Sequence, residues 1–197
     1  MPPVTQFDRR YYERFYLDPK TRVTDQAALD RLGDFVCSYL QYLPLSVKRV
    51  LDLGCGIGLW QKVLARHFPG ASYQGVEISD YLCQQYGWQQ GSVVDYKSRA
   101  RFDLVVCQGV LPYLDARTAK RAIDNLGALT RGALYLEAIT QDDWDSGIID
   151  KRRTDGSMLL RSASWYRRAL RPHFDALGGG VWLSKRAKPA LYALERA

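Results

Sequence analysis

The chain of 197 residues has few of the side chains that bind metals or form disulfides. It contains two histidines, and its four cysteines are far apart in the sequence, with no Cys-x-x-Cys pair. Structural zinc sites depend on closely spaced ligands of this kind, and the cysteine pattern here does not indicate a disulfide framework. The sequence therefore predicts neither, and we expect no metal in the functional site.

Long apolar stretches are also missing. No run of about eighteen apolar residues occurs, and the first residues are polar and aromatic where a signal peptide has an apolar centre. We therefore expect a cytoplasmic protein without a membrane partner. A chain of this length forms a single domain that buries roughly 70% of the surface of its unfolded state, which leaves no room for a separate substrate domain.

Residues 50–58 are rich in glycine and read Val-Leu-Asp-Leu-Gly-Cys-Gly-Ile-Gly. The apolar residues at the start predict a short buried strand, and the three glycines allow positive φ angles or the close approach of a ligand. Residues 59–68 predict a helix whose free N-terminal amides face the occupant of the loop. A tight turn without a ligand is the alternative interpretation.

The spacing of the glycines separates two kinds of nucleotide cofactor. A dinucleotide-binding loop has the pattern Gly-x-Gly-x-x-Gly, but Leu59 stands where the third glycine belongs. Instead, Asp52 precedes the first glycine by two positions, and the pattern Asp-Leu-Gly-Cys-Gly-Ile-Gly resembles motif I of the class I S-adenosylmethionine-dependent methyltransferases. The resemblance implies that S-adenosylmethionine binds here, with S-adenosylhomocysteine as product and Asp52 close to the amino group of the cofactor.

Further positions along the chain extend this resemblance. Glu77 ends the predicted second strand, residues 72–77, where the family keeps its ribose ligand, and the two oxygens of a carboxylate match two neighbouring hydroxyls. Ser92 stands where the family has an acidic residue near adenine. The first carboxylate after it is Asp95, three residues later, which is predicted to be a surface residue or a helix cap. The cofactor-binding residues that the resemblance implies are Asp52, Gly54, Cys55, Gly56, Gly58, Glu77, Ile78, Ser92, Val93, Gln108 and Gly109.

Strands and helices are predicted to alternate along the chain, which indicates an α/β fold with a parallel sheet. The resemblance covers about residues 47–195 and implies one domain with a seven-stranded, mostly parallel sheet, helices on both faces and an antiparallel C-terminal hairpin. The hairpin is predicted from residues 174–183 and 190–194, with the turn at 184–189. Residues 140–145 are predicted to be a polar loop.

Residues 1–46 are expected to form an N-terminal helical cap or lid, and residues 47–197 the cofactor-binding core. Within the cap, Thr24 or Asp25 begins a helix that ends before Pro44. The apolar residues predicted to share one face of this helix are Leu29, Leu32, Phe35, Val36, Leu40 and Leu43.

The acceptor site is expected over the carboxyl ends of the fourth and fifth strands. Large aromatic side chains with polar tips suit the enclosure of a small ligand or a sulfonium; those predicted to do so are Tyr11, Tyr12, Tyr16 and Trp144. Tyr113, Glu137 and Asp142 are the candidates for a catalytic base. Asp142, Asp143 and Asp145 also offer oxygen ligands for magnesium, but an ordinary polar loop is the favoured interpretation.

Charge is distributed unevenly along the chain. Residues 151–197 carry 11 basic and 3 acidic side chains, whereas residues 1–150 carry 17 and 18. Such a segment binds nucleic acid or an acidic substrate in some proteins, but no basic run reaches five residues, so a solvated surface is favoured.

The sequence therefore predicts a small S-adenosylmethionine-dependent methyltransferase, a monomer or homodimer, that acts on a small molecule. The alternatives are an RNA or protein methyltransferase that uses the basic C-terminal segment, or a non-catalytic module that binds S-adenosylmethionine or S-adenosylhomocysteine.

Overall fold

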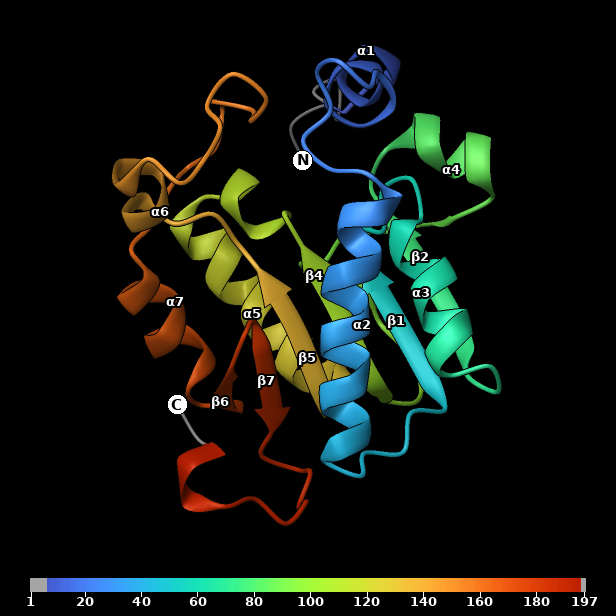
Figure 1. Cartoon of the computed structure of the whole chain (residues 1–197), viewed down its shortest axis with the longest axis vertical. Coiled ribbons are helices and arrows are strands. Elements are labelled where there is room, and N and C mark those ends of the chain that lie inside the picture. The colour runs from blue at the N-terminus through green and yellow to red at the C-terminus, as the bar shows by residue number, and fades with distance from the viewer. Residues whose placement is uncertain (1–6, 196–197) are drawn as a thin grey trace.

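The computed structural model describes residues 7–195 and contains a seven-stranded sheet with the strand order β3-β2-β1-β4-β5-β7-β6 (Figure 1). The first five strands of this order run parallel, and β7 is antiparallel to both of its neighbours. The predicted α/β fold class is confirmed. The strands are β1 Arg49–Leu53, β2 Ser72–Glu77, β3 Gln89–Gln90, β4 Phe102–Gln108, β5 Thr130–Glu137, β6 Phe174–Gly178 and β7 Val181–Ser184.

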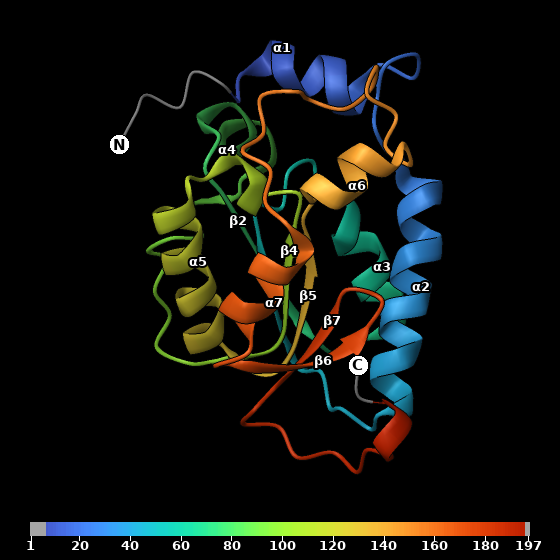
Figure 2. The same ribbon diagram turned by 90° about the vertical axis from the view of Figure 1, so that its left-hand side faces the viewer.

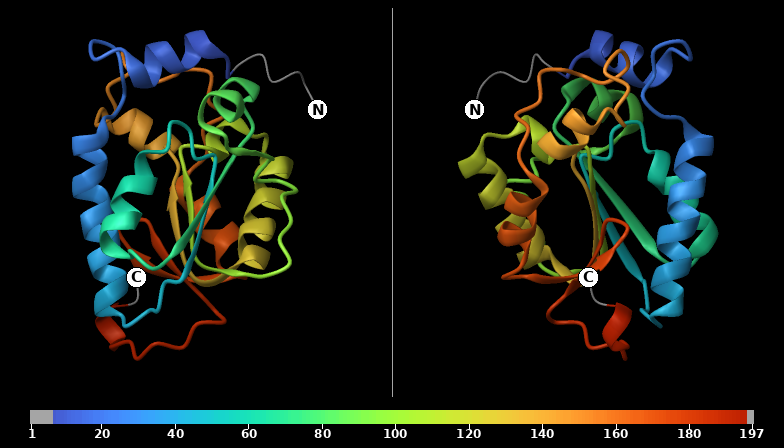
Figure 3. Two further views of the ribbon diagram at one scale, coloured as in Figure 1. Left: turned by 90° about the vertical axis from the view of Figure 1, so that its right-hand side faces the viewer. Right: turned by 60° about the vertical axis from the view of Figure 1, so that its left-hand side comes forward.

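Helices cover both faces of the sheet. On one face lie α2, Gln26–Tyr42, and α3, Leu59–His67; on the other lie α5, Ala116–Leu129, and α7, Ala163–Leu170 (Figures 2 and 3). Alternate residues of the central strand β4 face opposite sides: Leu104 packs with the α2 and α3 cluster, and Val105 with the α5 and α7 cluster. This period of two, with both faces apolar, is the pattern of a parallel strand buried between two helical layers.

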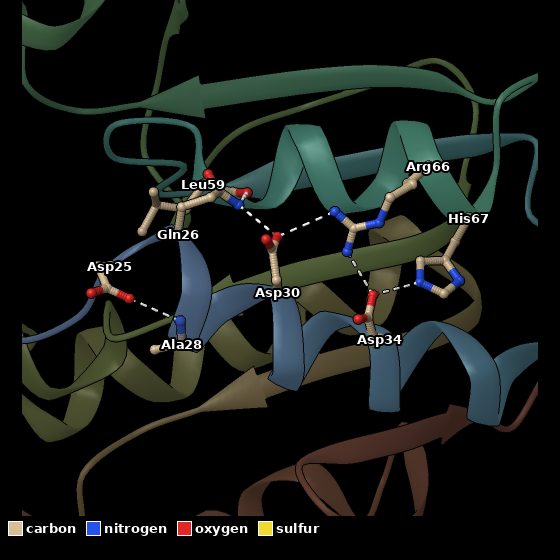
Figure 4. A network of polar contacts seen from close by, with 8 residues as sticks. All are labelled: Asp25, Gln26, Ala28, Asp30, Asp34, Leu59, Arg66 and His67. Atoms are coloured by element: carbon tan, nitrogen blue, oxygen red, sulfur yellow. Dashed lines mark hydrogen bonds and ion pairs between the residues drawn. The ribbon is translucent and has the colours of Figure 1, made fainter.

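A polar network joins α2 to α3 (Figure 4). The guanidinium of Arg66 contacts Asp34 at 2.6 Å and Asp30 at 3.4 Å, and His67 Nε2 lies 2.8 Å from the same Asp34 oxygen. The hydrogen bonds from His67 and Arg66 lower the pKa of Asp34. Arg66 and Asp34 are about half exposed, so the ion pair between them contributes little to stability.

Polar side chains start the helices as expected. Asp25, and not Thr24, caps α2 by accepting from the Ala28 amide at 2.9 Å, and Ser162 caps α7. The prediction for one residue of the apolar face of α2 was wrong: Phe35 is 49% exposed and stacks on Tyr39. Its position lies about 100° around the helix from Val36, which is buried, and this places Phe35 at the edge of the interface.

The C-terminal hairpin exists, but its predicted position was wrong. It is formed by β6 and β7, both within residues 174–184, and residues 190–194 form no strand. The turn is Gly179-Gly180, which follows Gly178, and all three glycines have positive φ. Three consecutive glycines allow the tight turn that divides the segment predicted as one strand. The predicted polar loop is also helical: α6, Gln141–Ser146, starts with a capping box between Thr140 and Asp143.

Above the carboxyl ends of the parallel strands lies a short helical segment, α1 (Arg9–Tyr12) followed by the π-helical turn η1 (Glu13–Leu17) (Figures 1 and 2). We call this segment, with Phe7 and Asp8, the lid. By contrast, α2 packs along the face of the sheet with α3. The two helical parts of residues 1–46 therefore differ in position: the lid lies over the strand ends, and α2 covers the sheet.

Asn125 of α5 fixes the loop that follows β3. Its side-chain amide is buried and donates to the carbonyls of Val93 and Tyr96, both at 3.0 Å. We expect Asn125→Ala to lower the free energy of unfolding by about 2 to 4 kcal/mol, because two buried carbonyls lose their donor. Urea unfolding checks this, with the exposed neighbour Arg121→Ala as the control, expected to stay within about 0.5 kcal/mol of the native chain. Equal stability of both variants would contradict this role.

Candidate functional site

The glycine loop connects β1 to α3 and is tied to the end of β2. The amides of Gly54 and Cys55 both donate to the Val76 carbonyl, at 2.8 and 3.2 Å. Gly54, Gly56 and Gly58 have φ values of 78°, 54° and 78°. A Cβ at Gly54 would lie 2.3 Å from Val110 Cγ2, so this glycine is required by both its backbone angle and its close neighbour.

Glu77, at the carboxyl end of β2, is buried beneath this loop, with 3% of its surface exposed. Its Oε2 accepts from the Gly56 amide at 2.9 Å, and its Oε1 accepts from the Ile78 and Ser79 amides at 2.8 and 3.1 Å. An ionised carboxylate has about four acceptor positions, so three amides orient Glu77 and leave it further capacity toward a ligand.

Asp52, the acidic residue of the glycine motif, is also buried. It accepts a hydrogen bond from the Tyr73 hydroxyl at 2.8 Å. Burial raises the pKa of Asp52 to about 7, and the negative charge of Glu77 adds to the rise, while the hydrogen bond from Tyr73 opposes it. A cationic group that arrives next to Asp52 would restore its charge, because a nearby positive charge favours the ionised form.

The ends of β4 and β5 carry a chain of hydrogen bonds. Trp60 Nε1 donates to Gln108 Oε1 at 2.7 Å, and Gln108 Nε2 donates to Glu137 Oε2 at 2.8 Å. The Tyr135 hydroxyl donates to the same Glu137 oxygen at 3.3 Å. Burial raises the pKa of Glu137, although both hydrogen bonds act in the opposite direction.

The lid closes over these groups through aromatic side chains. The hydroxyls of Tyr11 and Tyr113 are hydrogen-bonded at 2.8 Å, and the Phe7 ring packs edge-on against both rings at 5.1 Å. The Phe7 carbonyl accepts from Ser79 Oγ at 2.6 Å, which anchors the lid to the start of α4, Asp80–Tyr86. Burial raises the pKa of both tyrosines, so both hydroxyls stay protonated.

These elements enclose two connected hollows. The first is lined by Glu77, Ile78, Ser92 and Val93. The second has a volume of about 640 Å³ and is lined by Asp52, Cys55, Trp60 and Glu137 among others. Both are bounded by the lid, the glycine loop and the segment from the end of β4 to η2, and they share seven residues: Tyr11, Tyr16, Gly54, Gly56, Gln108, Gly109 and Tyr113. The structure thus brings together most of the residues predicted from the sequence.

Some predicted residues take other positions. Gly58 caps α3, and its neighbour there is Trp88, which donates from Nε1 to the Gly56 carbonyl at 2.9 Å. Tyr12 lines only the first hollow. Asp95 is exposed and borders neither hollow, in agreement with the surface position expected for it.

Two of the predicted site residues lie on α6 and do not border the cavity. Asp142 accepts from the Ala163 amide at 2.9 Å and so joins α6 to α7. Trp144 lies under the Lys151 ammonium at 5.0 Å. The three acids of this helix do not converge, since Asp143 accepts from the Thr140 amide and Asp145 accepts from the Gln141 side chain. In the part of the chain that the structure describes, no group of three or more histidine, cysteine, aspartate or glutamate side chains is placed to hold a metal.

The sequence did not point to one wall of the larger hollow. Residues 148–158 cross the mouth beside the lid and contribute Ile148, Ile149, Asp150, Arg153, Thr154, Asp155 and Met158. The Leu159 amide donates to the Pro112 carbonyl at 2.7 Å, which fastens this segment to the 3₁₀ turn η2, Leu111–Tyr113. The sequence feature that could have indicated this wall is the length of the stretch between β5 and α7.

The basic residues among 151–195 belong to several separate parts of the chain. They lie in the segment before α7, on α7 itself and in the segment after β7, which Figure 2 shows at different heights of the molecule. Two of them are used inside the fold: Arg161 donates to the carbonyls of Leu111 and Leu114, and Arg186 donates to the Gly127 carbonyl at 2.9 Å. Among residues 7–195, no helix is both long and apolar enough to cross a bilayer.

Comparison with known proteins identifies relatives of this chain. Residues 26–179 match the family model described as Methyltransferase domain. The ubiquinone biosynthesis O-methyltransferase of Coxiella burnetii (strain Dugway 5J108-111) is 32% identical over 116 residues, 52% of this chain and 48% of the relative. The trans-aconitate 2-methyltransferase of Pseudomonas aeruginosa is 29% identical over 161 residues, 78% of this chain and 50% of the relative. The chain therefore spans about half the length of these curated relatives.

Solved structures share the fold at low sequence identity. The structure of CalS10 from Micromonospora echinaspora, described as an amino pentose methyltransferase with bound S-adenosylmethionine, has a TM-score of 0.60 at 14% identity, covering 85% of this chain and 94% of that one. DesVI of Streptomyces venezuelae has the same TM-score at 12% identity, covering 80% and 92%.

The buried carboxyl of Asp52 predicts a pH-dependent stability. The folded state keeps its proton up to about pH 7, whereas the unfolded chain loses it near pH 3.8, so the contribution of this group is full below about pH 4 and is lost as the pH rises to 7. Relative to the native chain, Asp52→Asn should gain about 2 to 4 kcal/mol in free energy of unfolding between pH 4 and pH 8. Urea unfolding at several pH values measures this difference. The exposed Asp95→Asn serves as the control, and parallel curves for Asp52→Asn and the native chain would contradict the assignment.

Proposed function

Because the chain belongs to the Methyltransferase domain family, we propose that it binds S-adenosylmethionine between the glycine loop and the lid and transfers the methyl group to a small molecule. The observation that carries the proposal is the Glu77 carboxylate, which is buried, held by three backbone amides and turned toward a cavity. A buried carboxylate without a cationic partner is costly to maintain, and a bound ligand with neighbouring hydroxyl donors would supply hydrogen bonds that offset this cost.

The residues around the cavity fit the parts of this cofactor. Glu77 suits the ribose hydroxyls, and Ser92 with the apolar Ile78 and Val93 suits adenine. Asp52 lies under the glycine loop, where it suits the ammonium of the amino acid end. Tyr16 lines both hollows, and an aromatic ring favours a positively charged sulfur nearby.

When bound, S-adenosylmethionine supplies a methyl carbon that positive sulfur makes electrophilic, so the protein mainly positions the acceptor and excludes water. The lid serves the second task, because Phe7, Tyr11 and Tyr113 seal one side of the cavity. Gln108 fixes the orientation of Glu137, and Glu137 is the residue placed to receive a proton from an acceptor. Tyr113 is a weaker candidate because burial raises its pKa.

The alternatives receive less support. The curated relatives are named for methylation in ubiquinone biosynthesis and of trans-aconitate. A small acceptor also fits the larger hollow, which residues 148–158 cover. An RNA or protein substrate would need a continuous basic surface, whereas the basic residues are divided among three places. An open space beside Glu137 favours catalysis over a purely cofactor-binding module. The cytoplasmic location, the monomeric or homodimeric state and the boundary at residue 46 stay predictions.

Titration calorimetry with S-adenosylhomocysteine tests the cofactor site. We expect Glu77→Ala to weaken binding by about 1 to 3 kcal/mol, because the ribose hydroxyls lose their charged acceptor. Asp95→Ala is the matched control, since Asp95 is an exposed acid outside the cavity, and it should bind as the native chain does. Absence of binding to the native chain, or equal binding to all three proteins, would overturn the proposed site.

A glycine pair separates backbone strain from loss of ligand space. Gly56 and Gly87 have φ values of 54° and 71°, and a Cβ on either meets no atom within 4 Å, but only Gly56 lines the cavity. We expect Gly56→Ala and Gly87→Ala each to lose about 1 to 2 kcal/mol of stability. Only Gly56→Ala should weaken S-adenosylhomocysteine binding, by about tenfold or more, because its new methyl group intrudes on the ligand. Thermal unfolding and calorimetry on both variants make the comparison, and equal affinities would contradict it.

A further inference from the structure

The larger hollow carries the opposite charge to the chain as a whole. The full sequence has a net charge of +7, yet the aspartate, glutamate, lysine, arginine and histidine side chains that line this hollow are five carboxyls and one arginine. Asp52 serves the cofactor end. The other four acids, which lie on β5, on α6 and in the segment that crosses the mouth, are Glu137, Asp143, Asp150 and Asp155.

The one arginine does not balance these acids. Arg153 Nε faces Asp150 Oδ2 at 3.8 Å, so its charge is already directed toward one of them. Glu137, Asp143 and Asp155 form no ion pair with any of residues 7–195. An anionic acceptor such as a carboxylate would therefore enter a site that repels it, whereas a cation would be attracted.

The remaining wall favours an apolar cation. The rings of Phe15, Tyr16 and Trp60 border the hollow, together with aliphatic side chains of α2 and of residues 148–158. Aromatic faces attract cations and pack against apolar groups at the same time. Of the four acids other than Asp52, Glu137 is the one on a strand, at the end of β5, where it is hydrogen-bonded to Gln108, which lines both hollows.

One oxygen of Glu137 is available to a ligand. Its Oε2 accepts from Gln108 and Tyr135, while its Oε1 accepts no hydrogen bond from the part of the chain that the structure describes. We propose that the acceptor is an apolar amine that enters as its ammonium ion, and that Glu137 Oε1 binds its nitrogen. This proposal rests on the proposed methyltransferase function and specifies its substrate class.

Glu137 also has the chemistry to prepare such an acceptor. An ammonium nitrogen has no lone pair and cannot receive a methyl group. When the N–H bond that points at Oε1 breaks, the proton passes to the carboxylate and the electron pair stays on nitrogen as the lone pair. A neutral hydroxyl acceptor would use the same base but would gain nothing from the three further acids around the hollow.

Matched triplets of small molecules test the substrate class. The protein is first saturated with S-adenosylhomocysteine and then titrated, with NMR detection, with 2-phenylethylamine, 2-phenylethanol and 3-phenylpropanoate, and with tryptamine, tryptophol and indole-3-propanoate. We expect the amine of at least one triplet to bind about tenfold or more tightly than its alcohol, as for a charged hydrogen bond, and the carboxylate to bind most weakly. If no amine exceeds its partners, including the case in which nothing binds, the amine proposal is overturned while the cofactor site stands. Failure of S-adenosylhomocysteine to bind would overturn both.

Variants then locate the recognition. Glu137→Gln should weaken amine binding about tenfold and leave alcohol binding within about twofold. Asp145→Asn, an exposed acid of α6 outside the hollow, is the control and should change neither. Asp155→Asn, at the mouth, provides a second variant if Glu137→Gln does not fold, and it should weaken the amine selectively by a smaller factor. Equal losses for amine and alcohol would assign these residues a structural role and contradict the proposal.

Discussion

The glycine loop, the second strand and the lid are organised around one buried carboxylate, that of Glu77. It receives the Gly56 amide from one side and the Ile78 and Ser79 amides from the other, and thereby joins the ends of β1 and β2. Ser79 extends this arrangement, because its hydroxyl donates to the Phe7 carbonyl and holds the lid over the loop. Hydrogen bonds from amides to a carboxylate are stronger than those between neutral groups, so Glu77 is well suited to join three amides from two parts of the chain.

Basic and acidic side chains have different positions in this protein: some basic residues bind backbone carbonyls, whereas acidic residues line the cavity. Arg161 binds the carbonyls of Leu111 and Leu114 at the two ends of η2. Arg186 binds the Gly127 carbonyl in the last turn of α5, where the negative end of the helix dipole favours a guanidinium. Other basic residues remain at the surface. The cavity, in contrast, collects acids from segments distant in sequence, such as Asp52 and Glu137. The pI of about 9.3 therefore describes the outside of the molecule and not the site.

Local sequence patterns predicted the residues on the cofactor side of the cavity, whereas the other walls depend on long-range contacts. Asp52, the glycines and Glu77 follow from a strand, a turn and a second strand whose ends meet at one edge of a parallel sheet. The wall formed by residues 148–158 depends on contacts such as that of Leu159 with Pro112, which no local pattern shows. Asp142 was predicted as a base, but its carboxylate accepts the Ala163 amide instead. The hairpin was misplaced because Gly179 and Gly180 turn the chain inside an otherwise strand-like segment.

The central claim is that Glu77 and the glycine loop form the binding site of a ribose-containing cofactor beneath the lid. A crystal structure of the protein with S-adenosylhomocysteine tests it most directly. The account predicts the ribose hydroxyls at hydrogen-bonding distance from the Glu77 carboxylate, adenine beside Ser92 and Val93, and the sulfur facing the larger hollow. A ligand bound elsewhere, or in this cavity with its ribose away from Glu77, would contradict the account.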